Sequence, residues 1–177
     1  MAPGFWLNWL LASFAFSLGG GLTRFLVGPA DHPGAALAGG LIVGVLLGGG
    51  QWIPLRKFLP VGGAWIAATT IGTAIGIGSA SLAFGGASTI SSQILSWLIA
   101  GVAVGCAQWT VLRKATKDAI WWIPCVSVAW ASGWGVSRAV GVAATEHFVV
   151  FGFSGAFVFQ VVLGAMVRWL GKGKGAR

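Results

Sequence analysis

The sequence predicts an all-α integral membrane protein with six transmembrane helices arranged as three tandem hairpins. Three observations point to this fold. Charged residues make up only 8% of the 177 residues, against about 25% in soluble domains. Hydrophobic residues make up 56%, and 30 further residues are glycine. Finally, one segment recurs at a spacing of about 57 residues, which indicates an internal repeat.

Each of the six apolar runs is close to the length of about 20 residues that a helix needs to cross about 30 Å of hydrocarbon. None alternates polar and apolar positions as a strand of a membrane barrel would, so helices are the expected elements. Clusters of Gly, Pro and charged residues separate the runs. The runs cover residues 5–27, 34–52, 61–84, 92–112, 119–143 and 148–170.

These runs predict one membrane domain over residues 1–170, followed by a basic cytoplasmic tail at 171–177. The three hairpins are expected at about 1–57, 58–114 and 115–170. We expect the first run to be a retained helix rather than a cleaved signal peptide, because no basic segment precedes it and Arg24 lies within it.

The distribution of charge predicts that both termini are cytoplasmic, in the cell membrane. With the N-terminus inside, the inside segments contain every Lys and Arg except Arg24 and Arg138, and the outside loops contain Asp31 and Glu146. This follows the positive-inside rule. Tryptophans, which favour the headgroup level, are expected to mark the inner interface at Trp6, Trp9, Trp52, Trp65, Trp109, Trp121, Trp122 and Trp169.

The repeat is most visible in the second and fourth runs and in the start of the runs that follow them. Its first copy contains Gly44, Gly48, Gln51, Trp52, Leu55, Arg56, Lys57, Trp65, Ile66 and Gly76; its second contains Gly101, Gly105, Gln108, Trp109, Leu112, Arg113, Lys114, Trp122, Ile123 and Gly133. The odd runs show a weaker third copy, and the last run keeps Trp169 with basic neighbours but not the Gln-Trp motif.

The pattern Gly-x-x-x-Gly-x-x-Gln-Trp-x-x-Leu-Arg, followed by Trp at the start of the next helix, resembles a group of small uncharacterised bacterial multi-pass membrane proteins. The resemblance covers about residues 40–78 and 97–135. It implies a membrane architecture, and it brings no activity, cofactor or partner with it.

The glycine stripes at Gly40, Gly44 and Gly48 and at Gly101 and Gly105 favour close helix packing, within the chain, with another subunit or in self-association. The motif residues Gln51, Trp52, Arg56, Gln108, Trp109 and Arg113 have two interpretations. In the first, Trp lies at the headgroups, Arg reaches phosphate and Gln bonds a neighbouring helix. In the second, the motif binds a ligand. We favour the first.

Two clusters at the outer side are the candidate site for an anion or a lipid headgroup: Arg24, Asp31 and His32, and Arg138, Glu146 and His147. An arginine just inside a membrane helix end is costly unless it is paired. The alternative, which we favour, is that each arginine extends to the interface and pairs with the acid of its own loop.

Gln160 is the candidate polar residue within the membrane, because it lies near the middle of the last run. It is expected either to form an interhelical hydrogen bond or to line a solute path, and the first interpretation is favoured. Thr69, Thr70 and Thr73 are expected to bond the carbonyls of their own helix.

The function classes that remain are a non-enzymatic scaffold or accessory subunit and, as the alternative, a small solute or lipid transporter or channel-like protein. No nucleophile, phosphate-loop or paired-carboxylate motif is present, so no enzyme is expected. No metal-ligand spacing is present either, and no cofactor is expected. The expected partners are the lipid bilayer and other membrane subunits. Nucleic acid is excluded because no basic stripe lies away from the predicted membrane ends.

Overall fold

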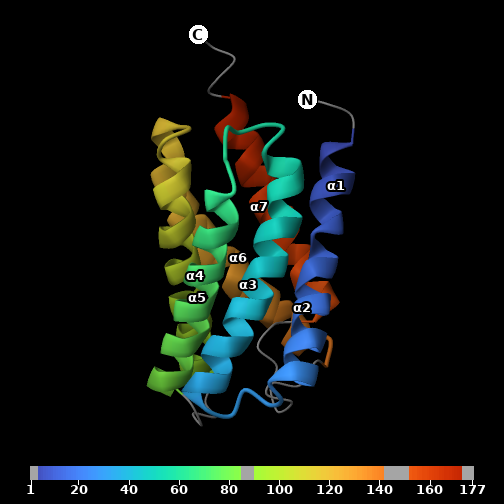
Figure 1. Ribbon diagram of the computed structural model, residues 1–177, viewed down its shortest axis with the longest axis vertical. Coiled ribbons are helices and arrows are strands. Elements are labelled where there is room, and N and C mark those ends of the chain that lie inside the picture. Colours follow the sequence, from blue (N-terminus) through green and yellow to red (C-terminus); the bar gives the residue numbers. More distant parts are fainter. Residues whose placement is uncertain (1–3, 85–89, 142–151, 173–177) are drawn as a thin grey trace.

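The computed structural model describes residues 4–84, 90–141 and 152–172, which form an all-helical bundle (Figure 1). Six of its helices are long and apolar enough to cross a membrane. The first of these is divided into α1 and α2, and a short 3-10 helix, η1, precedes α6. The elements are α1 (Phe5–Leu11), α2 (Ser13–Leu26), α3 (Pro33–Leu55), α4 (Ala64–Phe84), α5 (Ile90–Leu112), η1 (Lys117–Trp121), α6 (Trp122–Ala139) and α7 (Phe153–Lys172).

Each helix packs against the next one along the chain, and α7 packs back against α1 and α2. The helices therefore form a closed ring, in which neighbours run in opposite directions (Figure 1). The start of α1 and the end of α7 lie at the same end of the bundle (Figure 1). We call this the first end; the connections from α3 to α4 and from α5 to η1 also lie there, and the connection from α2 to α3 lies at the second end.

The break between α1 and α2 corrects the expectation of one continuous first helix. Ala12 N–H donates to the carbonyl of Trp9, and Ala15 N–H donates to the carbonyl of Ala12, at 3.1 Å each. These bonds span three residues instead of four and tighten the helix locally. The tighter turn shifts the register by one residue, so Trp9 is buried, whereas Asn8, 57 residues before Trp65, is exposed.

Glycines set the distance between neighbouring helices. A Cβ atom on Gly44 of α3 would lie 2.5 Å from the Cα of Thr70 in α4, and one on Gly101 of α5 would lie 2.6 Å from the Cα of Ser127 in α6. A Cβ on Gly76 of α4 would lie 2.8 Å from a carbonyl oxygen of α5. The predicted glycine stripes thus pack between helices of this one chain, and backbone meets backbone there.

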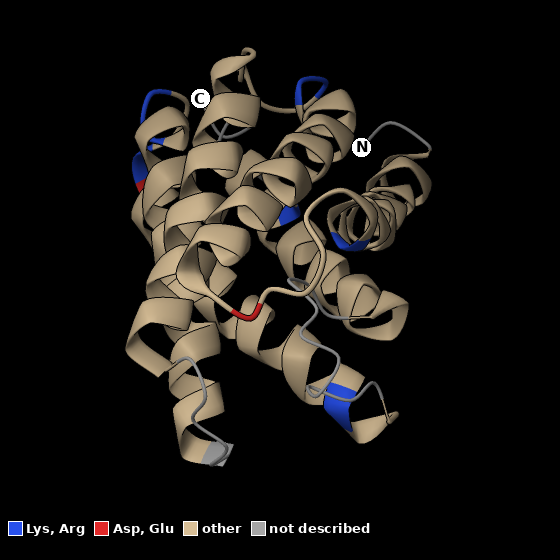
Figure 2. Ribbon diagram, turned by 60° about the horizontal axis from the view of Figure 1, so that its bottom comes forward, with Lys and Arg blue, Asp and Glu red and all other residues tan. Residues whose placement is uncertain are grey.

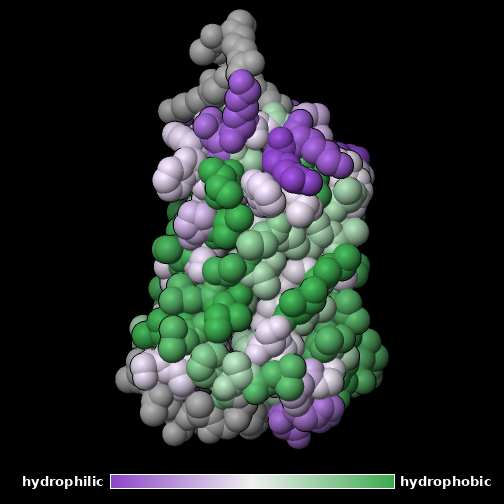
Figure 3. Space-filling model, turned by 90° about the vertical axis from the view of Figure 1, so that its left-hand side faces the viewer, coloured by the Kyte–Doolittle hydropathy of each residue, from purple (hydrophilic) through white to green (hydrophobic). Residues whose placement is uncertain are grey.

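The outward faces are apolar around the middle of the bundle. Large side chains such as Leu18, Ile71, Ile75, Val102 and Val128 are exposed there. Figure 3 shows hydrophobic residues over the middle of one face and hydrophilic residues toward its two ends. An exposed apolar surface of this extent is stable in contact with lipid.

The charged residues lie toward the ends of the bundle (Figure 2). Arg56 and Lys57 follow α3, and Arg113 and Lys114 follow α5, all at the first end. Arg24 and Arg138 lie in the last turns of α2 and α6, at the second end. Among the described residues, no Lys, Arg, Asp, Glu or His side chain is buried.

We predict that Gly44→Ala lowers the free energy of unfolding by about 1–3 kcal/mol, because its Cβ would force α3 away from α4. The measurement is the thermal or denaturant midpoint of the full chain in detergent. Gly49→Ala is the matched control: a Cβ there meets nothing within 4 Å. Replacing that helical glycine should raise stability by about 0.5–1 kcal/mol. Equal effects of the two substitutions would contradict the packing described.

Candidate functional site

Three glutamines, one from each of α3, α5 and α7, meet inside the bundle. Gln51 of α3, Gln108 of α5 and Gln160 of α7 are all fully buried. Gln51 Nε2 donates to Gln160 Oε1 at 3.2 Å, and Gln108 Nε2 donates to Gln51 Oε1 at 3.4 Å. The amides therefore connect three helices that are not adjacent along the chain. We call these three glutamines, together with Trp9, Trp65, Thr69 and Trp122, the Gln–Trp cluster.

Three tryptophans surround the glutamines, and all three are fully buried: Trp9 of α1, Trp65 of α4 and Trp122 of α6. Trp122 Nε1 donates to Gln108 Oε1 at 2.8 Å, and Trp9 Nε1 donates to the backbone carbonyl of Gln160 at 2.7 Å. The rings of Trp65 and Trp122 pack edge to face with centroids 5.8 Å apart. All three rings face other helices and are not exposed on the outside of the bundle, which corrects the expectation that they contact lipid headgroups.

The local sequence explains how Gln51 and Gln108 come to lie inside. Each follows a glycine by three residues, Gly48 and Gly105, so the two positions lie on one face of the helix. That face carries the glycines against which the following helix packs. A glutamine on such a face is directed toward other helices and must find its hydrogen bonds there.

Threonines of α4 add hydroxyl groups to the same interior. Thr69 Oγ1 accepts from Gln108 Nε2 at 2.9 Å and donates to the carbonyl of Trp65 at 2.8 Å. Thr70 and Thr73 donate to the carbonyls of Ile66 and Thr69, at 2.8 and 2.7 Å. The expected bonds from these threonines to their own helix are confirmed, and Thr69 also accepts a bond from a glutamine of the Gln–Trp cluster.

The motif arginines stack on the motif tryptophans at the first end of the bundle. The guanidinium of Arg56 lies 4.4 Å from the ring centroid of Trp52, and that of Arg113 lies 5.0 Å from the centroid of Trp109. Both tryptophans precede their arginines by one helical turn. The charged groups remain exposed, with their hydrogen-bond donors free to reach the solvent or a headgroup.

The last helix forms the same kind of pair with a ring from elsewhere in the chain. Arg168 lies over Trp6 of α1, 5.8 Å from its centroid. Gly164 lies one turn before Arg168, at the position where α3 has Trp52 and α5 has Trp109. A Cβ on Gly164 would lie 2.6 Å from the Trp6 ring, so the missing side chain leaves the room that Trp6 occupies.

Sequence reasoning missed this pair because Trp6 and Arg168 are far apart in the chain. The signal available in the sequence was an apolar residue directly before the arginine, and the structure shows that each of these residues is buried: Leu55, Leu112 and Val167. When α3, α5 and α7 are aligned on this apolar residue and its arginine, Gln160 corresponds to Gly48 and Gly105. Each of the three lies eight residues before the arginine of its helix.

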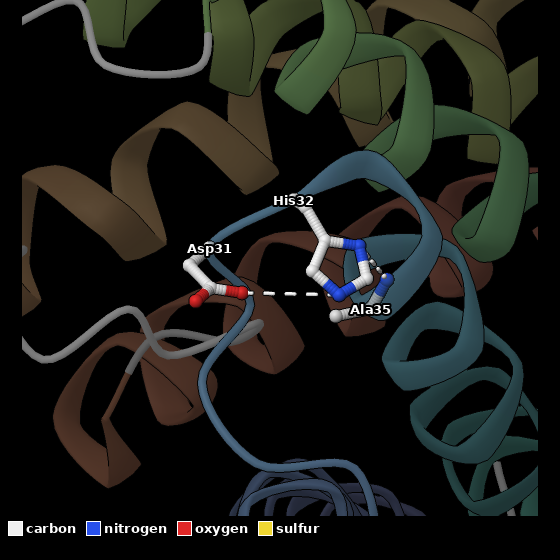
Figure 4. Close-up of polar contacts among 3 residues, drawn as sticks. All are labelled: Asp31, His32 and Ala35. Atoms are coloured by element: carbon white, nitrogen blue, oxygen red, sulfur yellow. Dashed lines mark hydrogen bonds and ion pairs between the residues drawn. The ribbon is translucent and has the colours of Figure 1, made fainter.

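At the second end of the bundle, His32 caps α3. Its Nδ1 accepts from the backbone N–H of Ala35 at 3.2 Å, and its Nε2 lies 3.9 Å from Oδ1 of Asp31 (Figure 4). Both side chains are mostly exposed. The acceptor at Nδ1 leaves the ring proton on Nε2, toward the carboxylate. No Lys or Arg lies within ion-pair distance of an acidic side chain in the described part of the chain, so Arg24 does not form the expected pair with Asp31.

The other outer cluster is described only through Arg138, which donates to Oε1 of Gln93 in α5. Glu146 and His147 lie outside the described residues. Arg24 and Arg138 belong to α2 and α6, and α7 packs against both of these helices. No group of three or more potential metal ligands occurs within residues 4–84, 90–141 and 152–172.

Comparison of the chain with known protein families, with characterised proteins and with solved structures finds no match.

We predict that His32→Ala lowers the free energy of unfolding by about 1 kcal/mol, because the first turn of α3 loses its side-chain acceptor. His32→Asn should keep the wild-type stability, since asparagine also accepts at this position. The measurement is the unfolding midpoint of each variant in detergent. If Asn destabilised the protein as much as Ala does, the role of His32 would lie in its ring and not in the cap.

Proposed function

We propose that this protein is a non-enzymatic scaffold or accessory subunit of a membrane. The Gln–Trp cluster is the observation that carries the proposal. Its amide, indole and hydroxyl groups bond mainly to one another across α1, α3, α4, α5, α6 and α7. Such bonds hold helices together. Pumps and many transporters place ionisable side chains inside the bundle, whereas no described charged side chain is buried here.

We further propose that the chain consists of three tandem hairpins, at about 1–57, 58–114 and 115–170, with both termini in the cytoplasm of the cell and the first end at the inner face. The three arginine–tryptophan pairs at the first end support this arrangement. Their arginines recur once per hairpin, and a guanidinium supported by a ring at the interface suits a phosphate headgroup. The resemblance to small bacterial multi-pass membrane proteins agrees with this architecture and adds nothing about activity.

The orientation is tested by cysteine accessibility in intact cells, with Cys106 and Cys125 replaced by alanine. We predict that Asp31→Cys reacts with a membrane-impermeant maleimide and that Lys57→Cys reacts only after permeabilisation. The two positions lie at opposite ends of the bundle, so each is the control of the other. Labelling of Lys57→Cys from outside would contradict the orientation.

The second candidate is a small solute or lipid transporter or channel-like protein with an outer-face Arg/His site. Two observations favour it: the polar interior itself, and buried donors without partners at Trp65 and Gln160. A solute path would use the Gln–Trp cluster as a lining, and Arg24, Asp31, His32 and Arg138 as an entrance.

Reconstitution separates the two candidates. In liposomes that contain the purified chain, the scaffold proposal predicts permeability to protons, chloride and glycerol equal to that of protein-free liposomes. It also predicts that, after mild detergent extraction from native membranes, the chain migrates in a larger complex than the purified chain does. The readouts are a trapped pH dye, a chloride electrode and light scattering after osmotic shock.

Gln160→Leu is the matched variant for the reconstitution, because it removes the amide and approximately keeps the volume. A flux above that of protein-free liposomes, lost in Gln160→Leu, would contradict the scaffold proposal and support the transporter.

A further inference from the structure

Two hydrogen-bond donors in the Gln–Trp cluster have no partner. Within the described residues these are Nε1 of Trp65 and Nε2 of Gln160, and both side chains are fully buried. Buried N–H groups are almost always bonded, and where no protein group reaches them an internal water or another small molecule does. The third buried group without a partner, Ser137 Oγ, belongs to α6 near its second-end terminus, away from this cluster.

Bonds and contacts link the two unpartnered donors to the same group of side chains. Gln160 Oε1 accepts from Gln51, and Gln51 Oε1 accepts from Gln108. Gln108 donates in turn to Thr69, which lies one turn after Trp65 on α4 and bonds the carbonyl of Trp65. The donors therefore lie at two positions of one connected cluster.

A comparison of Trp65 with Trp122 shows why one indole is bonded and the other is not. Each follows a cluster glutamine by 14 residues, and Trp122 Nε1 reaches Gln108 Oε1. The corresponding bond from Trp65 to Gln51 is not formed; the Gln51 oxygen accepts from Gln108, and the Gln51 nitrogen donates to Gln160. Gln160 occupies the position at which α3 has Gly48 and α5 has Gly105, and its amide oxygen is the acceptor for the Gln51 nitrogen.

The chemistry of the cluster determines which ligand it accepts. Each glutamine brings two N–H donors and one oxygen with two lone pairs, but an indole brings a donor and no acceptor. Three tryptophans therefore make the cluster rich in donors. A ligand that satisfies it must accept hydrogen bonds and be small enough for a fully buried position.

We propose that the Gln–Trp cluster holds one small hydrogen-bond acceptor, a water molecule or a small inorganic anion such as chloride, bound by Trp65 Nε1–H and the Gln160 amide N–H. This binding site is additional to the scaffold role and does not depend on it. The neutral donors suit water. The exposed Arg56 and Arg113, five residues and about 7.5 Å along the helix from Gln51 and Gln108, create a positive potential that suits an anion.

The test is the indole N–H spectrum of the full chain, labelled with ¹⁵N-tryptophan and held in detergent micelles. Trp65→Phe assigns the Trp65 signal, and Trp122 in the same spectrum is the reference for a bonded indole. The proposal predicts that the Trp65 proton resonates as far downfield as that of Trp122. A position upfield of Trp122, at the value of an indole with no acceptor, would overturn the proposal.

Two arms identify the ligand. Bound water predicts a cross-peak between the Trp65 indole proton and the water resonance that is unaffected when sodium gluconate replaces sodium chloride. Bound chloride predicts a shift of the Trp65 signal on that replacement, which reverses when chloride is restored. A downfield signal with neither response would also overturn the proposal, because a protein group would then be the acceptor.

Gln160→Met tests whether both donors share the ligand. It keeps the length of the side chain and removes its N–H groups, and the Trp65 signal should move upfield as the ligand is lost. Gln93→Met, near the second end of the bundle, is the control and should leave the signal in place. An unchanged Trp65 signal in Gln160→Met would overturn the shared site.

Discussion

The hydrogen bond from Gln51 to Gln160 connects α3 with α7, and the arrangement of the interior depends on it. An amide buried inside an apolar bundle is separated from bulk solvent, so other helices must supply most of its partners. Gln51 meets this need by reaching α7 with its nitrogen and α5 with its oxygen. In this arrangement Trp65 lacks the glutamine partner that its counterpart Trp122 has.

Glycine packing and amide bonding depend on each other. Amides can bond across the interior only if the helices are close, and the contacts at Gly44, Gly76 and Gly101 bring successive backbones together. Small residues alone would allow several sliding registers between neighbouring helices. The buried amides and indoles favour one register, because any shift would leave donors without partners. Close packing and polar bonding thus select the same arrangement.

The helices could be predicted from the sequence because hydrophobicity and length alone determine them. The threonine bonds could be predicted as well, since they are local to α4. The burial of Trp9, Trp65 and Trp122 could not be, because a tryptophan at a helix start suits a headgroup and a bundle interior equally. Which it faces depends on the rotation of each helix, and for Trp9 on the tight turn at Ala12.

Distant pairs were the hardest part of the site to anticipate. The sequence predicts an interhelical bond for Gln160, and Gln160 does accept one, but for its partner Gln51 the sequence predicts a position at the inner interface. The pair of Trp6 with Arg168 depends on the absence of a side chain at Gly164. An absent side chain gives no sequence pattern unless the register of the last helix is already known.

A double-mutant cycle on Gln51 and Gln160 tests most directly whether their hydrogen bond holds α3 to α7. The free energy of unfolding in detergent is measured for the wild type, Gln51→Leu, Gln160→Leu and the double variant. If this bond joins the two helices, the coupling is about 0.6 kcal/mol or more, the value typical of hydrogen bonds between membrane helices. Additive effects of the two substitutions would contradict it.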